Sequence, residues 1–238
     1  MRSIVIRGAF VLLGIAIAAA GVQGATIGAF SGPYGNSGDA QGPFQIGNDF
    51  TVTDPNGITV SQLGIFDDGF DGLSQAHNVA IYNLNGSVLM ASATVSAGTT
   101  GFSSSDGPYT YTNPTSSTSS NPQTQGGFRY VSIAPVFLPN GFQGSIVGYD
   151  LSNTPGNIDD YGDFGTLPAA DAGEITFQTS RYTGTSAATG LPTATTGVGE
   201  NFGTGTFAFT PAPEPASLAL MGLGVAGLLI RRRTLRSV

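Results

Sequence analysis

The chain of 238 residues contains no cysteine, no tryptophan and no lysine, and its single histidine is His77. Without cysteine there is no disulfide framework and no thiolate nucleophile. Without lysine there is no Schiff-base amine and no phosphate-loop lysine. The motifs H-E-x-x-H and G-x-S-x-G are absent as well. We therefore expect no catalytic residues and no enzymatic activity.

Positive charge is scarce in the middle of the chain. Between residues 25 and 212, Arg129 and Arg181 face fourteen acidic residues, which gives this region a net charge of −12. Such a surface repels nucleic acid and anionic membranes and favours solubility and divalent cations. The region is long enough for one domain with a proper core. We expect a single domain over residues 25–210 and no nucleic-acid partner.

The composition of this domain indicates β-structure. It is rich in Gly, Ser, Thr, Asn and Phe and lacks helix-favouring runs of Glu, Leu or Ala. Short β-branched or aromatic runs recur between turn clusters. They predict strands over residues 44–53, 58–66, 77–83, 87–95, 128–138, 145–151, 174–179 and 206–210, with 26–30 as a ninth.

The clearest local pattern is a hairpin. Val79 and Ile81 share one face of a strand while Ala80 and Tyr82 share the other, and residues 84–86 form a turn into the next strand. The fold class that follows is all-β, an antiparallel sandwich or jelly roll without helices in this domain. We expect residues 98–126, 152–173 and 183–205 to be loops, the first a polar insertion outside the core.

The C-terminus carries a distinctive arrangement of residues. Pro213, Glu214 and Pro215 precede an uncharged run over residues 216–230, and four arginines follow: Arg231, Arg232, Arg233 and Arg236. This arrangement resembles the PEP-CTERM sorting signal of Gram-negative bacteria. The resemblance implies recognition by an exosortase, a membrane-embedded peptidase or transpeptidase, and export alongside exopolysaccharide. We expect the sorting signal to occupy residues 211–238.

The physical properties of this tail agree with a membrane span. A helix over residues 216–230 would be about 22 Å long, short against a hydrocarbon core of about 30 Å. The arginines can snorkel to the headgroups and, by the positive-inside rule, lie on the cytoplasmic side of the inner membrane. The prolines keep the segment before the helix extended and accessible to a peptidase. The alternative is an ordinary single-span anchor that follows a proline pair.

The N-terminus is typical of a secretory signal. Residues 1–7 contain two arginines, residues 8–21 are apolar, and residues 22–24 offer small side chains to signal peptidase. We expect a signal peptide over residues 1–24, with cleavage after Gly24 and residues 18–20 as the second choice. A permanent N-terminal anchor is the alternative. Both ends thus predict an exported protein that is anchored facing outward and then reaches the cell surface or extracellular matrix.

An acidic turn offers the only sharp candidate for a metal site. Asp67, Asp68 and Asp71 alternate with glycines in D-D-G-F-D-G, and calcium needs several convergent oxygen ligands. The spacing is not that of an EF-hand. A solvated turn between two strands is the alternative. The same choice applies, with a weaker case for calcium, to a second acidic cluster: Asp159, Asp160 and Asp163.

A second resemblance covers the middle of the domain. Residues 60–67, 71–73, 77–82, 86–89, 91–95 and 127–131 are similar to a pattern of "LG-h-aspartate, H-x-V-x-h, G-x-h-L-A". That pattern belongs to uncharacterised β-sandwich domains of bacterial surface proteins, of the DUF4082 type. Where the pattern usually has a tryptophan, this chain has Phe128 and Tyr130. The resemblance implies a fold and says little about a ligand.

Two classes of function remain after these exclusions. The first is a non-catalytic surface or matrix protein associated with exopolysaccharide. The second is a glycan-binding module that uses calcium and the loop aromatics Tyr109, Tyr111 and Tyr161. A glycan hydrolase with paired carboxylates is third, because sequence does not give their separation. His77 is expected to be structural, bonded to a backbone carbonyl or an aspartate at the start of a strand.

Overall fold

The structure is a computed structural model of the chain. It describes residues 26–29, 36–38, 44–68, 72–98, 102–103, 109–110, 125–151, 161–164, 173–184, 189–197 and 201–212, and for some strand residues, among them Asp68, Tyr109 and Tyr161, the backbone alone. The chain divides into two compact units, and Gln23–Pro213 forms one of them. The other consists of the two ends of the chain, whose residues lie outside the described ranges.

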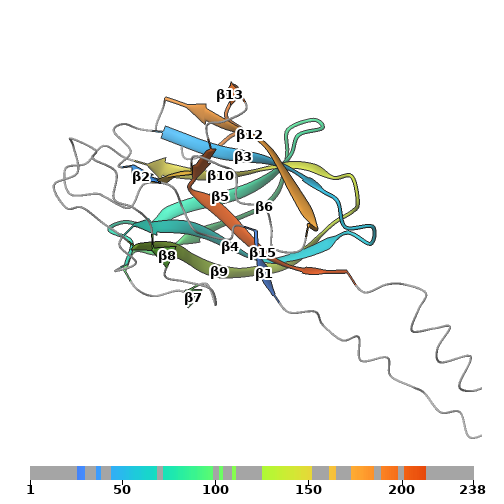
Figure 1. The fold of residues 1–238 in the computed structure, drawn as a ribbon, viewed down its shortest axis with the longest axis horizontal. Helices are drawn as coiled ribbons and strands as arrows, with labels where there is room; N and C mark the ends of the chain where they lie inside the picture. The colour runs from blue at the N-terminus through green and yellow to red at the C-terminus, as the bar shows by residue number, and fades with distance from the viewer. Residues whose placement is uncertain are drawn as a thin grey trace, which may run out of the picture. The chain divides into compact units, whose positions relative to one another are not determined.

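The described residues form strands and no helix, and every strand pair is antiparallel (Figure 1). One sheet, which we call the β3 sheet, has the order β13-β12-β3-β10-β5-β6. Its strands are β13 (Ala194–Gly197), β12 (Ile175–Thr183), β3 (Phe44–Val52), β10 (Gln143–Leu151), β5 (His77–Asn83) and β6 (Val88–Val95).

The second large sheet, the β4 sheet, has the order β1-β15-β4-β9-β7, and β8 also pairs with β9. Its strands are β1 (Ile27–Gly28), β15 (Gly205–Pro211), β4 (Ile58–Asp68), β9 (Gln125–Leu138), β7 (Phe102–Ser103) and β8 (Tyr109–Thr110). A small third sheet has the order β14-β11-β2, with β14 (Asn201–Gly203), β11 (Tyr161–Phe164) and β2 (Asn36–Gly38).

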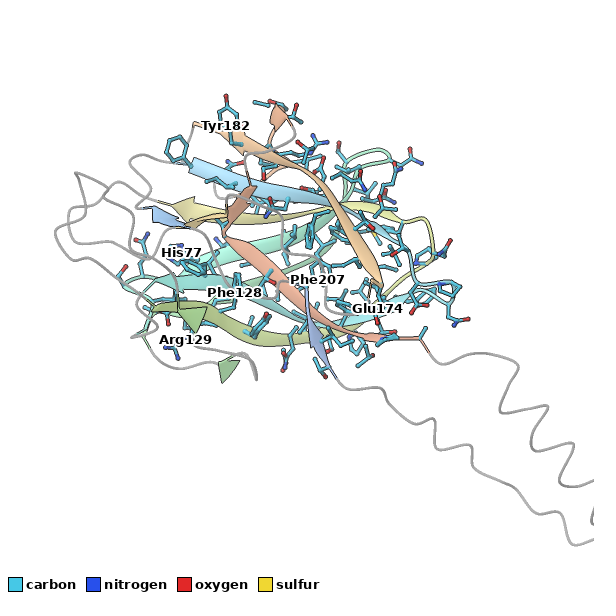
Figure 2. The ribbon with its side chains drawn as sticks, in the orientation of Figure 1. His77, Phe128, Arg129, Glu174, Tyr182 and Phe207 are labelled. Atoms are coloured by element: carbon cyan, nitrogen blue, oxygen red, sulfur yellow. The ribbon has the colours of Figure 1, made fainter. Side chains whose placement is uncertain are left out.

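One apolar core joins the two large sheets. It takes Phe50 from β3 and Ile146 from β10, and it takes Phe128 and Phe207 from the β4 sheet. The rings of Phe50 and Phe207 lie 4.9 Å apart between centroids, so an aromatic contact bridges the two sheets. Figure 2 shows Phe128 and Phe207 between the sheets. The expected all-β fold with two packed antiparallel sheets is confirmed for the described residues.

The predicted hairpin forms as its pattern indicates. Val79 and Ile81 lie in the core between the sheets, and Ala80 and Tyr82 pack together on the other face of β5. The second strand begins one residue later than expected. Ser87 has a φ of 54°, a left-handed conformation that belongs to the turn rather than to an extended strand.

Each predicted strand is present, with ends shifted by a few residues. The segments expected to be loops contain short strands as well: β7 and β8 extend the β4 sheet within residues 98–126, and β11, β13 and β14 fall within the other two. The expectation that all three segments are loops is therefore wrong for these strands. Two-residue to four-residue strands in glycine-rich sequence carry too little periodicity to be recognised.

A glycine in β10 shows how tightly the core is packed. A Cβ atom at Gly144 would lie 2.8 Å from Cζ of Phe50 and would also overlap the ring of Phe142. The aromatic rings lie directly against the backbone there, which only glycine allows.

Candidate functional site

The outer face of the β3 sheet carries a second apolar cluster, apart from the core. Ala80 and Tyr82 of β5 pack there against Val147 and Tyr149 of β10, and Leu191 covers them. Leu191 belongs to a segment over residues 189–192, which we call the strap, that runs across this face before β13 begins. The strap lies in the segment 183–205 that was expected to be a loop, and Leu191 packs it against the sheet.

Two tyrosines fasten the strap by a ring of hydrogen bonds. The amide of Gly190 donates to the hydroxyl oxygen of Tyr82 at 3.1 Å, and the hydroxyl of Tyr149 donates to the carbonyl of Gly190 at 2.9 Å. The two phenol oxygens are 2.9 Å apart. Because the single proton of Tyr149 goes to Gly190, the proton between the two phenols comes from Tyr82. Each of the three residues thus donates once around the ring.

Burial determines the ionisation of this tyrosine pair. It raises the pKa of the Tyr149 phenol above its ordinary value, because the charged phenolate would lose its hydration there. The ring therefore requires the neutral phenol, which can donate a proton where a phenolate cannot.

A groove lies beside the strap on the same outer face. It has a volume of about 380 Å³, and its main lining residues come from β5, β6, β10 and the strap: Asn78, Ala80, Tyr82, Leu89, Ser92, Thr94, Tyr149 and Thr189. The hydroxyl of Thr94 donates to the side-chain oxygen of Asn78 at 2.6 Å, which orients that amide. Among the described residues that line it, the two tyrosines are the only ionisable side chains.

The two arginines of the compact unit each form an ion pair with an aspartate. Nε of Arg129 on β9 donates to Oδ2 of Asp67 on β4, and Nε of Arg181 on β12 donates to Oδ1 of Asp49 on β3. In both pairs the partners lie on adjacent strands and on the same face of the sheet. Arg129 pairs with Ile65 and Arg181 with Gly47, so each arginine is opposite a residue two positions away from its aspartate. Asp67 is fully buried and 7% of the Arg129 side chain is exposed, whereas Arg181 keeps 19% of its side chain exposed.

Asp67 is one of the three candidate calcium ligands of the acidic turn, together with Asp68 and Asp71. Its Oδ2 accepts from Arg129, and its Oδ1 accepts the backbone amide of Gly72 at 3.3 Å. The Asp68 side chain and Asp71 lie outside the described residues. Within the described ranges no three acidic or imidazole groups gather as metal ligands would. The calcium site stays a prediction, and Asp67 has a structural partner in Arg129.

His77 has the structural role expected from its place in the sequence. It is fully buried at the start of β5, and its Nδ1 lies 3.3 Å from the carbonyl oxygen of Tyr149. A carbonyl only accepts, so Nδ1 carries the proton in this hydrogen bond. Figure 2 shows His77 at the opposite end of the sandwich from Glu174.

Several other candidate residues cannot be located by their side chains. Tyr109, Tyr161 and Asp163 are placed in β8 and β11 by their backbone, and Tyr111, Asp159 and Asp160 lie outside the described residues. Residues 1–24 of the expected signal peptide and residues 213–238 of the sorting signal also lie outside them. Among the described residues there is no helix long and apolar enough to cross a membrane.

The last strand leads straight to the sorting signal. Pro211 is paired with Ile58 in the β4 sheet, and the amide of Ala212 donates to the carbonyl of Gly57 at 2.9 Å. Residues 211–238 were expected to form the sorting signal. The first two of them, Pro211 and Ala212, belong to the fold, and the others lie outside the described residues.

A comparison with protein families identifies the segment that follows the last strand. Residues 211–233 match the family model of the PEP-CTERM protein-sorting motif. The chain carries a PEP-CTERM sorting motif. The match includes Pro213, Glu214 and Pro215 together with Arg231, Arg232 and Arg233, and Arg236 lies beyond it. The motif indicates an exported surface protein of a Gram-negative bacterium, with an exosortase as its processing partner. A search of the curated proteins found no match.

The strap and the groove are the features that sequence reasoning missed. Tyr82 and Tyr149 are 67 positions apart, and their meeting depends on the pairing of β5 with β10. One signal was available: Tyr82 lies on the opposite face of its strand from Val79 and Ile81. A large side chain on that face indicates that something covers it.

Proposed function

We propose that this is a non-catalytic surface or matrix protein, sorted by an exosortase, whose β-sandwich associates with extracellular polysaccharide. The observation that carries the proposal is the PEP-CTERM motif immediately after the last strand of a compact β-sandwich. The sandwich would be the part that remains outside the cell after the tail has been processed.

The contacts of the charged and titratable side chains support a non-catalytic role. His77 is buried and hydrogen-bonded to a backbone carbonyl, and both arginines of the compact unit are held by aspartates. Groups that commonly transfer protons or stabilise anions in enzymes are here engaged in holding strands together.

The proposal is tested by fractionation of a host that has an exosortase and secretes exopolysaccharide. The mature protein is expected in the matrix fraction, and enzymatic digestion of the polysaccharide should release it into the medium. A strain of the same host that makes no exopolysaccharide is the control, and there the protein should be in the medium without digestion. Equal retention by cells of both strains would contradict the association.

A further inference from the structure

The groove on the outer face of the β3 sheet has preformed walls. One wall is the strap, which Tyr82 and Tyr149 hold through Gly190. The floor is the antiparallel pairing of β5 with β10 and with β6, the latter with one register shift between Ile81 and Tyr82. A ligand would not have to order these elements on binding, which lowers the entropic cost of association.

The side chains of the groove combine neutral polar groups with apolar surface. Ser92, Thr94 and Thr189 are exposed and offer hydroxyls, and Asn78 offers an amide. Leu89 is 51% exposed and presents apolar surface at the same place. A sugar ring has the matching chemistry, with hydroxyls at its edge and C–H groups on its faces.

The charge of the domain favours a neutral saccharide over an anionic one. The region from residue 25 to residue 212 has a net charge of −12, and its two arginines are both paired with aspartates. An anionic polymer would be repelled by this surface and would find no unpaired arginine to bind it. A neutral saccharide avoids both costs.

We propose that the groove lined by Asn78, Leu89, Ser92, Thr94 and Thr189 binds a short stretch of a neutral polysaccharide. This inference rests on the proposed function and names the site and the ligand class for it. The volume of about 380 Å³ is near the lower end of the range for ligand pockets, about 300–1,000 Å³, so the site holds a short segment and not a long chain.

The test uses the exported chain purified in detergent and an array of short neutral oligosaccharides, with uronate oligosaccharides of matched length. Ser92→Tyr fills the groove, and Ser132→Tyr is its matched control, because Ser132 is an exposed strand serine on β9 of the other sheet. Thr94→Val removes one hydroxyl and keeps the shape of the side chain. Melting temperatures show that each variant is folded.

The wild type and Ser132→Tyr are expected to bind neutral oligosaccharides alike. Ser92→Tyr should weaken binding by at least about tenfold, and Thr94→Val by up to roughly tenfold, the effect of one lost hydrogen bond. If Ser92→Tyr does not fold, Thr94→Val decides alone. Binding only to uronates, no binding to the array, or unchanged binding by a folded groove variant would overturn the site.

The amount of each protein in the matrix fraction distinguishes a failure of this inference from a failure of the proposed function. If the wild type is released by digestion of the polysaccharide and Ser92→Tyr is retained equally well, the groove is not the site although the association stands. If the wild type is not retained by the polysaccharide at all, the proposed function itself fails.

Discussion

Arg129 and Asp67, 62 positions apart in the chain, form an ion pair between β9 and β4 from which solvent is almost excluded. The same carboxylate accepts the amide of Gly72, so it also holds the last residue of the acidic turn. Buried charges are costly unless they are paired and hydrogen-bonded, and each partner here depends on the other.

Removing one partner of this pair should therefore destabilise the domain strongly. We expect Asp67→Ala to lower the free energy of unfolding by about 3–5 kcal/mol, because Arg129 would stay buried without a counter-charge. Denaturant titration of the exported protein measures this. The double replacement Asp67→Leu with Arg129→Met should cost far less, and a double variant as unstable as the single one would show that the charges are not the reason.

Calcium binding at the acidic turn can be tested with the same exported protein. If Asp67, Asp68 and Asp71 converge on the ion, saturating calcium should raise the melting temperature above that in a chelator, because a ligand of the folded state stabilises it by mass action. Asp71→Asn should abolish the difference and leave the melting temperature in the chelator unchanged. Identical melting of the wild type in both buffers would leave Asp67 as the partner of Arg129 alone.

The tyrosine ring predicts a matched pair of variants. Tyr82→Phe and Tyr149→Phe each break the ring, and each should lower the free energy of unfolding by about 1 kcal/mol. The loss should be larger for Tyr82→Phe, because the Gly190 amide then has lost its acceptor. Limited proteolysis within the strap should become faster in both. Unchanged stability and unchanged cleavage would show that the strap is held by Leu191 and its apolar contacts instead.

The same ring gives a pH dependence. The folded state raises the pKa of Tyr149, so the phenol's contribution is complete below its unfolded pKa, about 10, and is lost as the pH rises further. The wild type should lose stability above that pH more steeply than Tyr149→Phe does. Parallel curves for the two proteins would contradict the prediction.

The space around two glycines predicts different effects of an alanine at each position. Gly144→Ala should cost about 1–3 kcal/mol, because its Cβ would meet the rings of Phe50 and Phe142. Gly184→Ala has open space around it and should be neutral or slightly stabilising. Thermal melting of the two variants compares them directly, and equal effects would mean that the core around Phe50 relaxes freely.

The strands of the sandwich could be predicted because their signal is local. Alternation over residues 77–83 assigns Val79 and Ile81 to the core with no knowledge of a partner strand. The burial of Arg129 could not be predicted in that way. It depends on β9 lying beside β4 in a register that brings Asp67 within reach, and a local sequence pattern does not specify which strands pair.

The groove was unpredictable for a related reason. Its residues come from β5, β6, β10 and the strap, and the strap lies in glycine-rich and threonine-rich sequence that reads as a loop. The sorting motif is the opposite case. It is contiguous, so the order Pro-Glu-Pro, uncharged run and arginines was sufficient to recognise it, and the family comparison confirms it for residues 211–233.

The most direct test of the account is the fate of the tail in a host that has an exosortase. The triple replacement Pro213→Ala, Glu214→Ala and Pro215→Ala changes residues beyond Ala212, whose hydrogen bond with Gly57 is the last one among the described residues, and should leave the domain folded. Mass spectrometry of the mature C-terminus should find that the wild type has lost its arginines and that the triple variant keeps them in the inner membrane. A triple variant that matures like the wild type would show that the tail is a plain anchor.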